Sequence, residues 1–195
     1  PSLIVDGDMQ LNGGNVQLAV NNSVQVTGNL TLNGDAVLTV PSATSSRVYT
    51  LQVDVTGTVT IEAGSRIALD GKGYPADYYS GPDFSHNTRP SCHGGNRYTT
   101  TADCTYGRYE HARFAGSAGS RYDNSRPGMG GGYLSLTASS LQLDGAITAN
   151  GDAGSHNAAS GGAGGGVHLA VDVLSGAGNV NANRGVGWSK HTSYG

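Results

Sequence analysis

The sequence contains little charge and almost no lysine. Asp, Glu, Lys and Arg make up 13% of its 195 residues, and the formal net charge at pH 7 is −3. Lys72 and Lys190 are the two lysines. Nucleic-acid sites require clustered Lys and Arg, so we expect no nucleic-acid partner. A chain kept unfolded by charge repulsion would be far more charged, so we expect a folded protein.

Long hydrophobic runs are also missing. No apolar stretch approaches the roughly 20 residues of a membrane-spanning helix, so we expect no membrane insertion. No stretch has the pattern of a signal peptide, and the chain opens directly in strand-like alternation. We therefore expect a fragment of a longer secreted protein, located outside the cell or at its surface, with the targeting signal elsewhere.

Cysteine is limited to Cys92 and Cys104, twelve positions apart. We predict a disulfide between them, worth about 3 kcal/mol in the loop-entropy model and typical of an oxidising compartment; two free thiols are the alternative. The spacing of these cysteines and of His86, His93 and His111 matches no usual zinc pattern. We therefore expect no zinc.

Glycine, in contrast, is abundant, with 32 residues of 195. The glycines do not recur at every third position, which excludes collagen. Hydrophobic residues make up only 36% of the chain. This composition favours one folded domain over residues 1–195, built from thin repeated layers that need little core and little charge.

Apolar and polar residues alternate in short pieces along the first forty residues. The pieces start six to eight positions apart and are joined by links rich in Asn and Gly; they are Met9–Leu11, Val16–Leu18, Val24–Val26, Leu30–Leu32 and Val37–Val40. Alternation with a period of two indicates strands, and Asn and Gly tolerate turn conformations.

Such short strands predict an all-β fold of the parallel β-helix (β-solenoid) class, in which equivalent strands of successive coils stack. Three strands would make a coil of about 20 to 24 residues. A β-sandwich is the alternative, because it also uses many short strands. We prefer the solenoid because the pieces are shorter than the usual sandwich strand.

Two long stretches, 130–151 and 164–185, are near copies of one another. Ile147 corresponds to Val180, and Ile67 begins a third, upstream copy. The repeat predicts neighbouring coils, with the glycine-rich residues 152–163 as a loop that projects between them. The glycines at 164–166 would return the chain to the stack where backbones approach closely.

The stretches "GGGYLSLTASSLQLDGAITANG" and "GGAGGGVHLAVDVLSGAGNVNANRG" resemble a glycine-rich solenoid repeat of very large secreted bacterial surface proteins, including adhesin-like ones. The resemblance covers residues from about 55 to 185, except one insert. It implies the fold and an extracellular location. It implies no enzymatic activity, and no catalytic residues can be transferred.

That insert, residues 74–127, breaks the repeat, and we predict a long inserted loop. It contains nine of the thirteen aromatic residues, six of the eleven basic residues and three of the six histidines. Loops of this length are usually functional. Tyrosine and arginine are typical of recognition surfaces, so we predict a surface that binds a glycan or a cell-surface protein. Packing of the loop against the coils is the alternative.

The candidate ligand-binding residues are those of the insert that combine rings, hydrogen-bonding groups and charge. They are Tyr78, Tyr79, His93, Arg97, Tyr106, Arg108, Tyr109, Glu110, His111 and Arg113. Glu110 and His111 could form an acid–base pair, although neighbours in an extended chain point to opposite sides. Salt bridges of Glu110 with Arg108 and Arg113 are the simpler interpretation.

Three further hypotheses stay open. Calcium, the one cofactor considered, could bind through Asp70, Asp77 and Asp83 or through Asp144 and Asp152, which lack EF-hand spacing. A polysaccharide lyase or glycoside hydrolase would need paired carboxylates, and the sequence shows no clear pair, so we expect a binding module and assign no catalytic residue. Alternatively, the chain is a structural fibre spacer that associates with itself through exposed solenoid ends.

Overall fold

The computed structural model describes residues 2–19, 22–75, 93, 112–119, 127–155 and 159–187. Within these ranges the chain forms strands and no helix. These ranges accordingly contain no helix that could cross a membrane.

The strands belong to two sheets. Sheet A contains β1 (Leu3–Val5), β4 (Asn22–Val26), β7 (Leu51–Val55), β10 (Tyr133–Leu143), β12 (Gly166–Ser175), β8 (Thr58–Ile61), β5 (Leu30–Asn33) and β2 (Met9–Asn12). Sheet B contains β13 (Asn179–Asn181), β11 (Ala146–Thr148), β9 (Arg66–Ala68), β6 (Val37–Thr39) and β3 (Asn15–Gln17).

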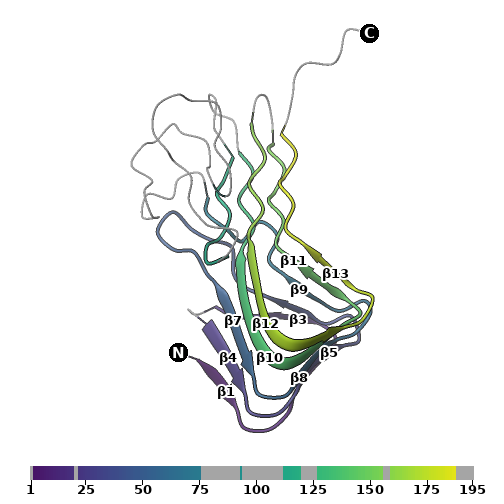
Figure 1. The fold of residues 1–195 in the computed structure, drawn as a ribbon. Coiled ribbons are helices and arrows are strands. Elements are labelled where there is room, and N and C mark those ends of the chain that lie inside the picture. The colour runs from purple at the N-terminus through teal and green to yellow at the C-terminus, as the bar shows by residue number, and fades with distance from the viewer. Residues whose placement is uncertain are drawn as a thin grey trace.

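All strand pairings are parallel, and the chain winds through both sheets once per layer (Figure 1). We name the layers coil 1 (β1–β3), coil 2 (β4–β6), coil 3 (β7–β9), coil 4 (β10 and β11) and coil 5 (β12 and β13). The antiparallel β-sandwich alternative is wrong, because sandwich sheets are built from antiparallel neighbours.

The core lies inside the coils and consists of ladders of inward-facing aliphatic side chains. One ladder joins Met9, Leu30, Val59, Leu141 and Leu174 in register. Its three inner members, in coils 2 to 4, are fully buried. Burial of apolar surface contributes about 25 cal/mol per Å². Each inner coil buries such surface on both of its neighbours and is stabilised by both contacts.

The alternation seen in the sequence therefore has the predicted consequence in coils 1 and 2. The short apolar pieces correspond to β2 to β6, with one side chain in two directed at the core. The repeat is also confirmed in its second half: Ile67, Ile147 and Val180 pair in sheet B. Its first half is shifted by one residue, because Tyr133 pairs with Gly166 and not with Val167.

The predicted fold class, a parallel β-helix (β-solenoid) with three short strands per coil and one long inserted loop, is wrong. Strand β10 has 11 residues and β12 has 10, and each takes the place of two short strands. Because β10 pairs with both β7 and β8, sheet A continues around the corner as one curved sheet. What the structure contains is an all-β chain with two parallel sheets and irregular coils.

The coil length also varies, which the constant predicted period did not allow. Leu3 pairs with Val24, Asn22 with Leu51, Leu51 with Leu134 and Leu134 with Val167, so successive coils are separated by 21, 29, 83 and 33 residues. The extra residues leave the coils between sheet B and the next strand of sheet A. Parallel stacking requires matched strands only, so the connections are free to grow.

Candidate functional site

The extra residues of coils 3 to 5 form a second layer of structure, which we call the glycine bundle. It comprises residues 70–75, 112–119, 127–132, 149–155, 159–165 and 182–187. Figure 1 shows chain segments that continue side by side beyond the strands of both sheets. Residues 112–119 of the predicted inserted loop, and residues 152–155 and 159–163 of the predicted glycine-rich loop, lie in this bundle.

Backbone hydrogen bonds hold the bundle together, although its segments are not strands. The Gly131 N–H donates to the Ala163 carbonyl at 2.9 Å, while its carbonyl accepts from Gly116 at 2.8 Å. One residue earlier, the Gly130 carbonyl accepts from Gly73 at 2.7 Å. A strand bonds to two neighbours at most. A segment that bonds to more than two neighbours needs backbone N–H and C=O groups that point in three directions. An extended helix of three residues per turn has this arrangement.

Glycine is needed here because the backbones approach too closely for a side chain. A β-carbon on Gly131 would overlap the Ala149 carbonyl oxygen, and one on Gly162 would overlap the Met129 carbonyl oxygen. A β-carbon on Gly165 would likewise overlap the Gly132 carbonyl oxygen, which confirms the close approach expected for residues 164–166. Glycine-rich sequence thus specifies ordered packing in this layer.

Small side chains fill the remaining interior of the bundle. Ala115, Ala118 and Ala159 are buried, as is Ser117, whose hydroxyl has no hydrogen-bond partner within the described ranges. The stretch Ala115–Gly119 reads Ala-Gly-Ser-Ala-Gly, the composition of the other bundle segments. This composition was the available signal that residues 112–119 differ from the aromatic part of the insert.

The bundle fixes the residues on both sides of the aromatic-rich part of the insert. The Tyr74 N–H donates to the Gly116 carbonyl at 2.8 Å, and the Gly130 N–H donates to the Tyr74 carbonyl at 3.3 Å. Further along, the Gly119 N–H donates to the Gly128 carbonyl at 2.9 Å. Hydrogen bonds of the bundle therefore hold Tyr74 and Gly116, which lie on either side of residues 76–111.

Two of the ten candidate ligand-binding residues are described. His93 is half-buried, with its Nδ1 2.9 Å from the Gly164 carbonyl oxygen. Burial lowers the pKa of its imidazole, and the bond to Gly164 opposes this shift in part. Arg113 is exposed at the start of a bundle segment. His93 and Arg113 therefore both lie at the bundle, and no interaction between their side chains is seen.

The remaining candidates lie outside the described residues. They are Tyr78, Tyr79, Arg97, Tyr106, Arg108, Tyr109, Glu110 and His111, together with the predicted disulfide partners Cys92 and Cys104. Their roles stay predictions made from the sequence.

The acidic residues considered for calcium are described in part. Asp70 accepts hydrogen bonds from the Asn150 N–H at 2.6 Å and the Thr148 hydroxyl at 2.9 Å, and Asp144 accepts from the Ala177 N–H at 3.1 Å. These carboxylates therefore join neighbouring coils. No group of three or more potential metal ligands occurs in the part of the chain that the structure describes; Asp77 and Asp83 lie outside it.

Asp152 differs from these two acids. Its residue is exposed as a whole, but its carboxyl group lies against Gly71. Partial burial of this group raises its pKa, the charge of Asp70 raises it further, and Lys72 acts in the opposite direction. A protonated carboxyl is therefore easier to accommodate at this position than a charged one.

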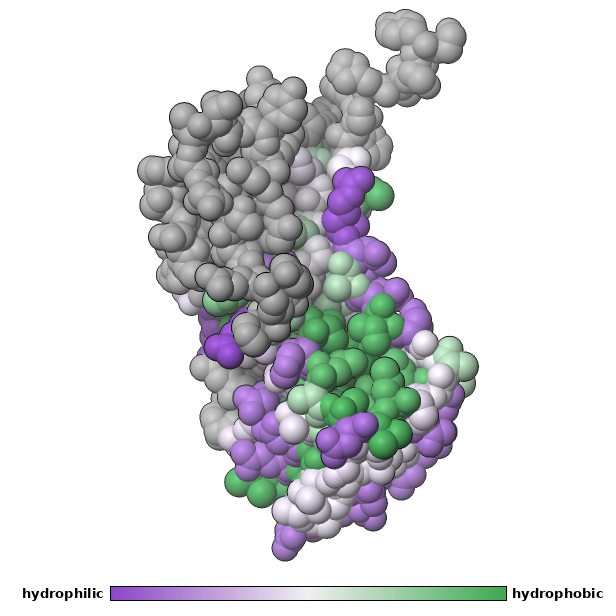
Figure 2. All heavy atoms as spheres, viewed as in Figure 1, coloured by the Kyte–Doolittle hydropathy of each residue, from purple (hydrophilic) through white to green (hydrophobic). Residues whose placement is uncertain are grey.

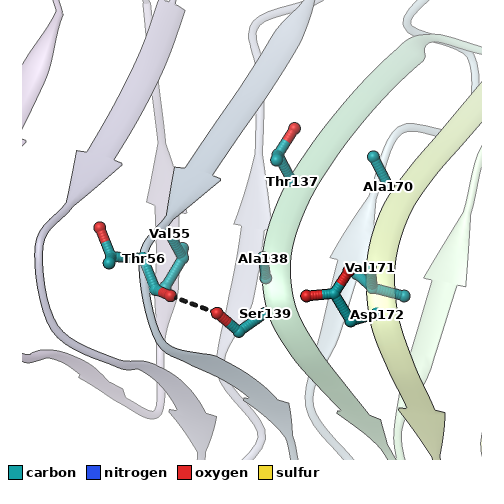
Figure 3. A pocket seen from close by; sticks show the side chains of 8 residues that line it. All are labelled: Val55, Thr56, Thr137, Ala138, Ser139, Ala170, Val171 and Asp172. Carbon is teal, nitrogen blue, oxygen red and sulfur yellow. Dashed lines mark hydrogen bonds between the residues drawn. The ribbon is translucent and has the colours of Figure 1, made fainter.

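An open hollow of about 580 Å³ lies outside the bundle, where β7, β10 and β12 bend (Figure 3). It is lined by Val55, Thr56, Thr137, Ala138, Ser139, Ala170, Val171 and Asp172. The Ser139 hydroxyl donates to the Thr56 carbonyl at 2.6 Å. With one carboxylate and no aromatic ring among its lining residues, the hollow has neither the acid pair of a glycosidase nor a stacking platform for a sugar.

Comparisons of the chain with protein-family models, with curated proteins and with solved structures gave no match. The site must therefore be interpreted from its own geometry and chemistry.

Proposed function

We propose that the chain is an extracellular, adhesin-like module that binds a glycan or a cell-surface protein through residues 76–111. The observation that carries this proposal is the anchoring of both ends of that stretch by the glycine bundle, at Tyr74 and at Gly116. Anchored ends lower the entropy that a segment loses on binding.

The difference between the side chains of sheet A and those of residues 76–111 supports the same function. The outer row of sheet A reads Gln10, Thr31, Thr60, Gln142 and Ser175 in register. Polar side chains of this kind give little apolar area for recognition, whereas tyrosine supplies a large apolar face and a hydroxyl at low entropic cost. Residues 76–111 contain five tyrosines and three arginines.

Binding to a glycan array and to extracted cell-surface proteins tests the proposal. A triple variant, Y106A/R108A/Y109A, should lose at least tenfold in affinity for any ligand found, since recognition residues of this type often contribute more than about 1.4 kcal/mol. The matched control, T31A/T60A/Q142A on the outer row of sheet A, should bind as the unaltered chain does.

Two results would count against the proposal. One is the absence of any ligand for the folded chain. The other is a ligand whose affinity falls with the sheet A control and is unchanged by the triple variant, which would place the binding surface on the coils.

A further inference from the structure

Both ends of the coil stack are open within the described residues. At one end β12 pairs with β10 alone and β13 with β11 alone; at the other, β1 pairs with β4 alone, β2 with β5 and β3 with β6. Each end therefore presents an edge of unpaired backbone groups, which is a template for pairing with a further strand.

The apolar ladders end in exposed side chains at the same two places. One ladder runs from Leu3 in coil 1 through Val24 and Val53 to Leu136 in coil 4. Val53 and Leu136 are fully buried, but Leu3 at the end of the ladder is 40% exposed. At the opposite end, Leu174 is 60% exposed although its partner Leu141 is fully buried.

Figure 2 shows the resulting face of coil 5, where apolar side chains gather between the polar strand edges. The set comprises Val167, Leu169, Val171, Leu174 and Val180, all of which continue core ladders. Contiguous exposed apolar faces of soluble proteins often mark interaction sites, so this face fits an interaction surface.

We infer that the open face of coil 5 binds coil 1 of a second copy of this chain, head to tail. The chain itself contains four junctions of this kind, and each joins two coils by parallel pairing and aligned ladders. In a fifth junction Leu169 would meet Leu3, Leu174 would meet Met9, and Val180 would meet Val16 of the second copy. Each end supplies the neighbours that the other lacks.

Two hydrogen bonds between coils also run in one direction along the stack, each from a backbone N–H to a side-chain oxygen of the preceding coil. The Asp70 carboxylate accepts from the Asn150 N–H one coil later, and the Asn150 side-chain oxygen accepts from the Asn183 N–H at 2.8 Å. Asn183 occupies the next position of this row in coil 5. Two faces of coil 5 placed against each other would instead pair their strands antiparallel, unlike any junction in the chain.

One pair of charges opposes this contact. Asp172 lies in β12 at the bend, and Asp6 follows β1 at the corresponding bend of coil 1. In the head-to-tail junction these carboxylates would come close, so D172N should strengthen the association. Because the two faces differ and the coils stack along one axis, the association is open-ended and yields a series of oligomers.

Sedimentation of the full chain over a range of concentrations tests the inference, with circular dichroism to confirm that each variant folds. The mass should rise with concentration. L174K and L3K should each stay monomeric when alone. The matched controls are V173K and I4K, at neighbouring positions that are also exposed but pair outside the core ladders; they should behave as the unaltered chain does.

A mixture of L174K and L3K separates the head-to-tail arrangement from others. L174K keeps an intact coil 1 and L3K keeps an intact coil 5, so the mixture should form a dimer of one chain each. Self-association of L3K alone would overturn the inference, because it would indicate contact between two coil 5 faces. Monomeric behaviour of the unaltered chain at all concentrations would also overturn it. Neither outcome depends on glycan binding.

Discussion

At the scale of single residues, the glycines of the bundle act by having no side chain. Gly131 lies where four segments of the bundle meet, and a β-carbon there would overlap the Ala149 carbonyl oxygen, which is part of the backbone and cannot move aside. We expect G131A to lower the free energy of unfolding by at least about 2 kcal/mol.

Gly187 is the control for this substitution. It belongs to the same bundle, but a β-carbon added to it would lie 3.6 Å from its nearest neighbour, the Ala159 carbonyl oxygen. G187A should therefore stay within about 1 kcal/mol of the unaltered chain in urea unfolding. Equal stability of G131A and G187A would contradict the packing described for the bundle.

A second prediction at this scale concerns His93. Its pKa is lower in the folded chain than the ordinary value of 6.5, chiefly because of burial. The unfolded chain therefore binds the proton more readily, and the free energy of unfolding should decrease as the pH falls through this range. H93Q should lose part of this decrease between pH about 7.5 and about 5, whereas H168Q, at an exposed strand position, should keep it.

At the scale of the elements, the position of a strand in the stack decides what its side chains contribute. Leu141 and Leu174 belong to one ladder and are direct partners, but the first is fully buried and the second 60% exposed. L141A should cost about 3 kcal/mol of unfolding free energy, and L174A less than about 1 kcal/mol. Similar losses, measured by urea unfolding at a concentration where the chain is monomeric, would place coil 5 inside the core.

Strands β2 to β6 could be predicted from the sequence because their inward-facing residues are apolar and each link between them contains Asn or Gly. The merger of two short strands into β10 could not, because Ser139 and Ser140 at the bend interrupt the alternation as a turn would. In the structure Ser139 and Ser140 instead bond to Thr56 and Thr58 of the coil below, at 2.6 and 2.7 Å.

At the scale of the whole molecule, the chain consists of two kinds of layer on one winding path. Apolar ladders hold the coils together, and carbonyl and N–H groups hold the bundle together. The coils can be recognised from sequence periodicity, since the apolar ladders consist of side chains. The bundle cannot, because glycine backbones have no pattern of hydrophobicity. Residues 152–163 therefore resembled a loop.

The candidate site was predictable to a similar extent. The unusual composition of residues 74–127 identified the segment, but not that its part from Ala112 to Gly119 is packed in the bundle. Arg113 and Phe114 continue the composition of the rest of the insert, and the small side chains of Ala115–Gly119 have the composition of a linker.

The central claim is that the glycine-rich segments form an ordered, hydrogen-bonded bundle, and amide hydrogen exchange tests it most directly. The amides of Gly116, Gly131, Gly162 and Gly185 donate to carbonyls of other segments, so they should exchange as slowly as those of β10, within the range of global unfolding. Exchange of these amides at the rate of an unstructured chain, with β10 still protected, would contradict the account.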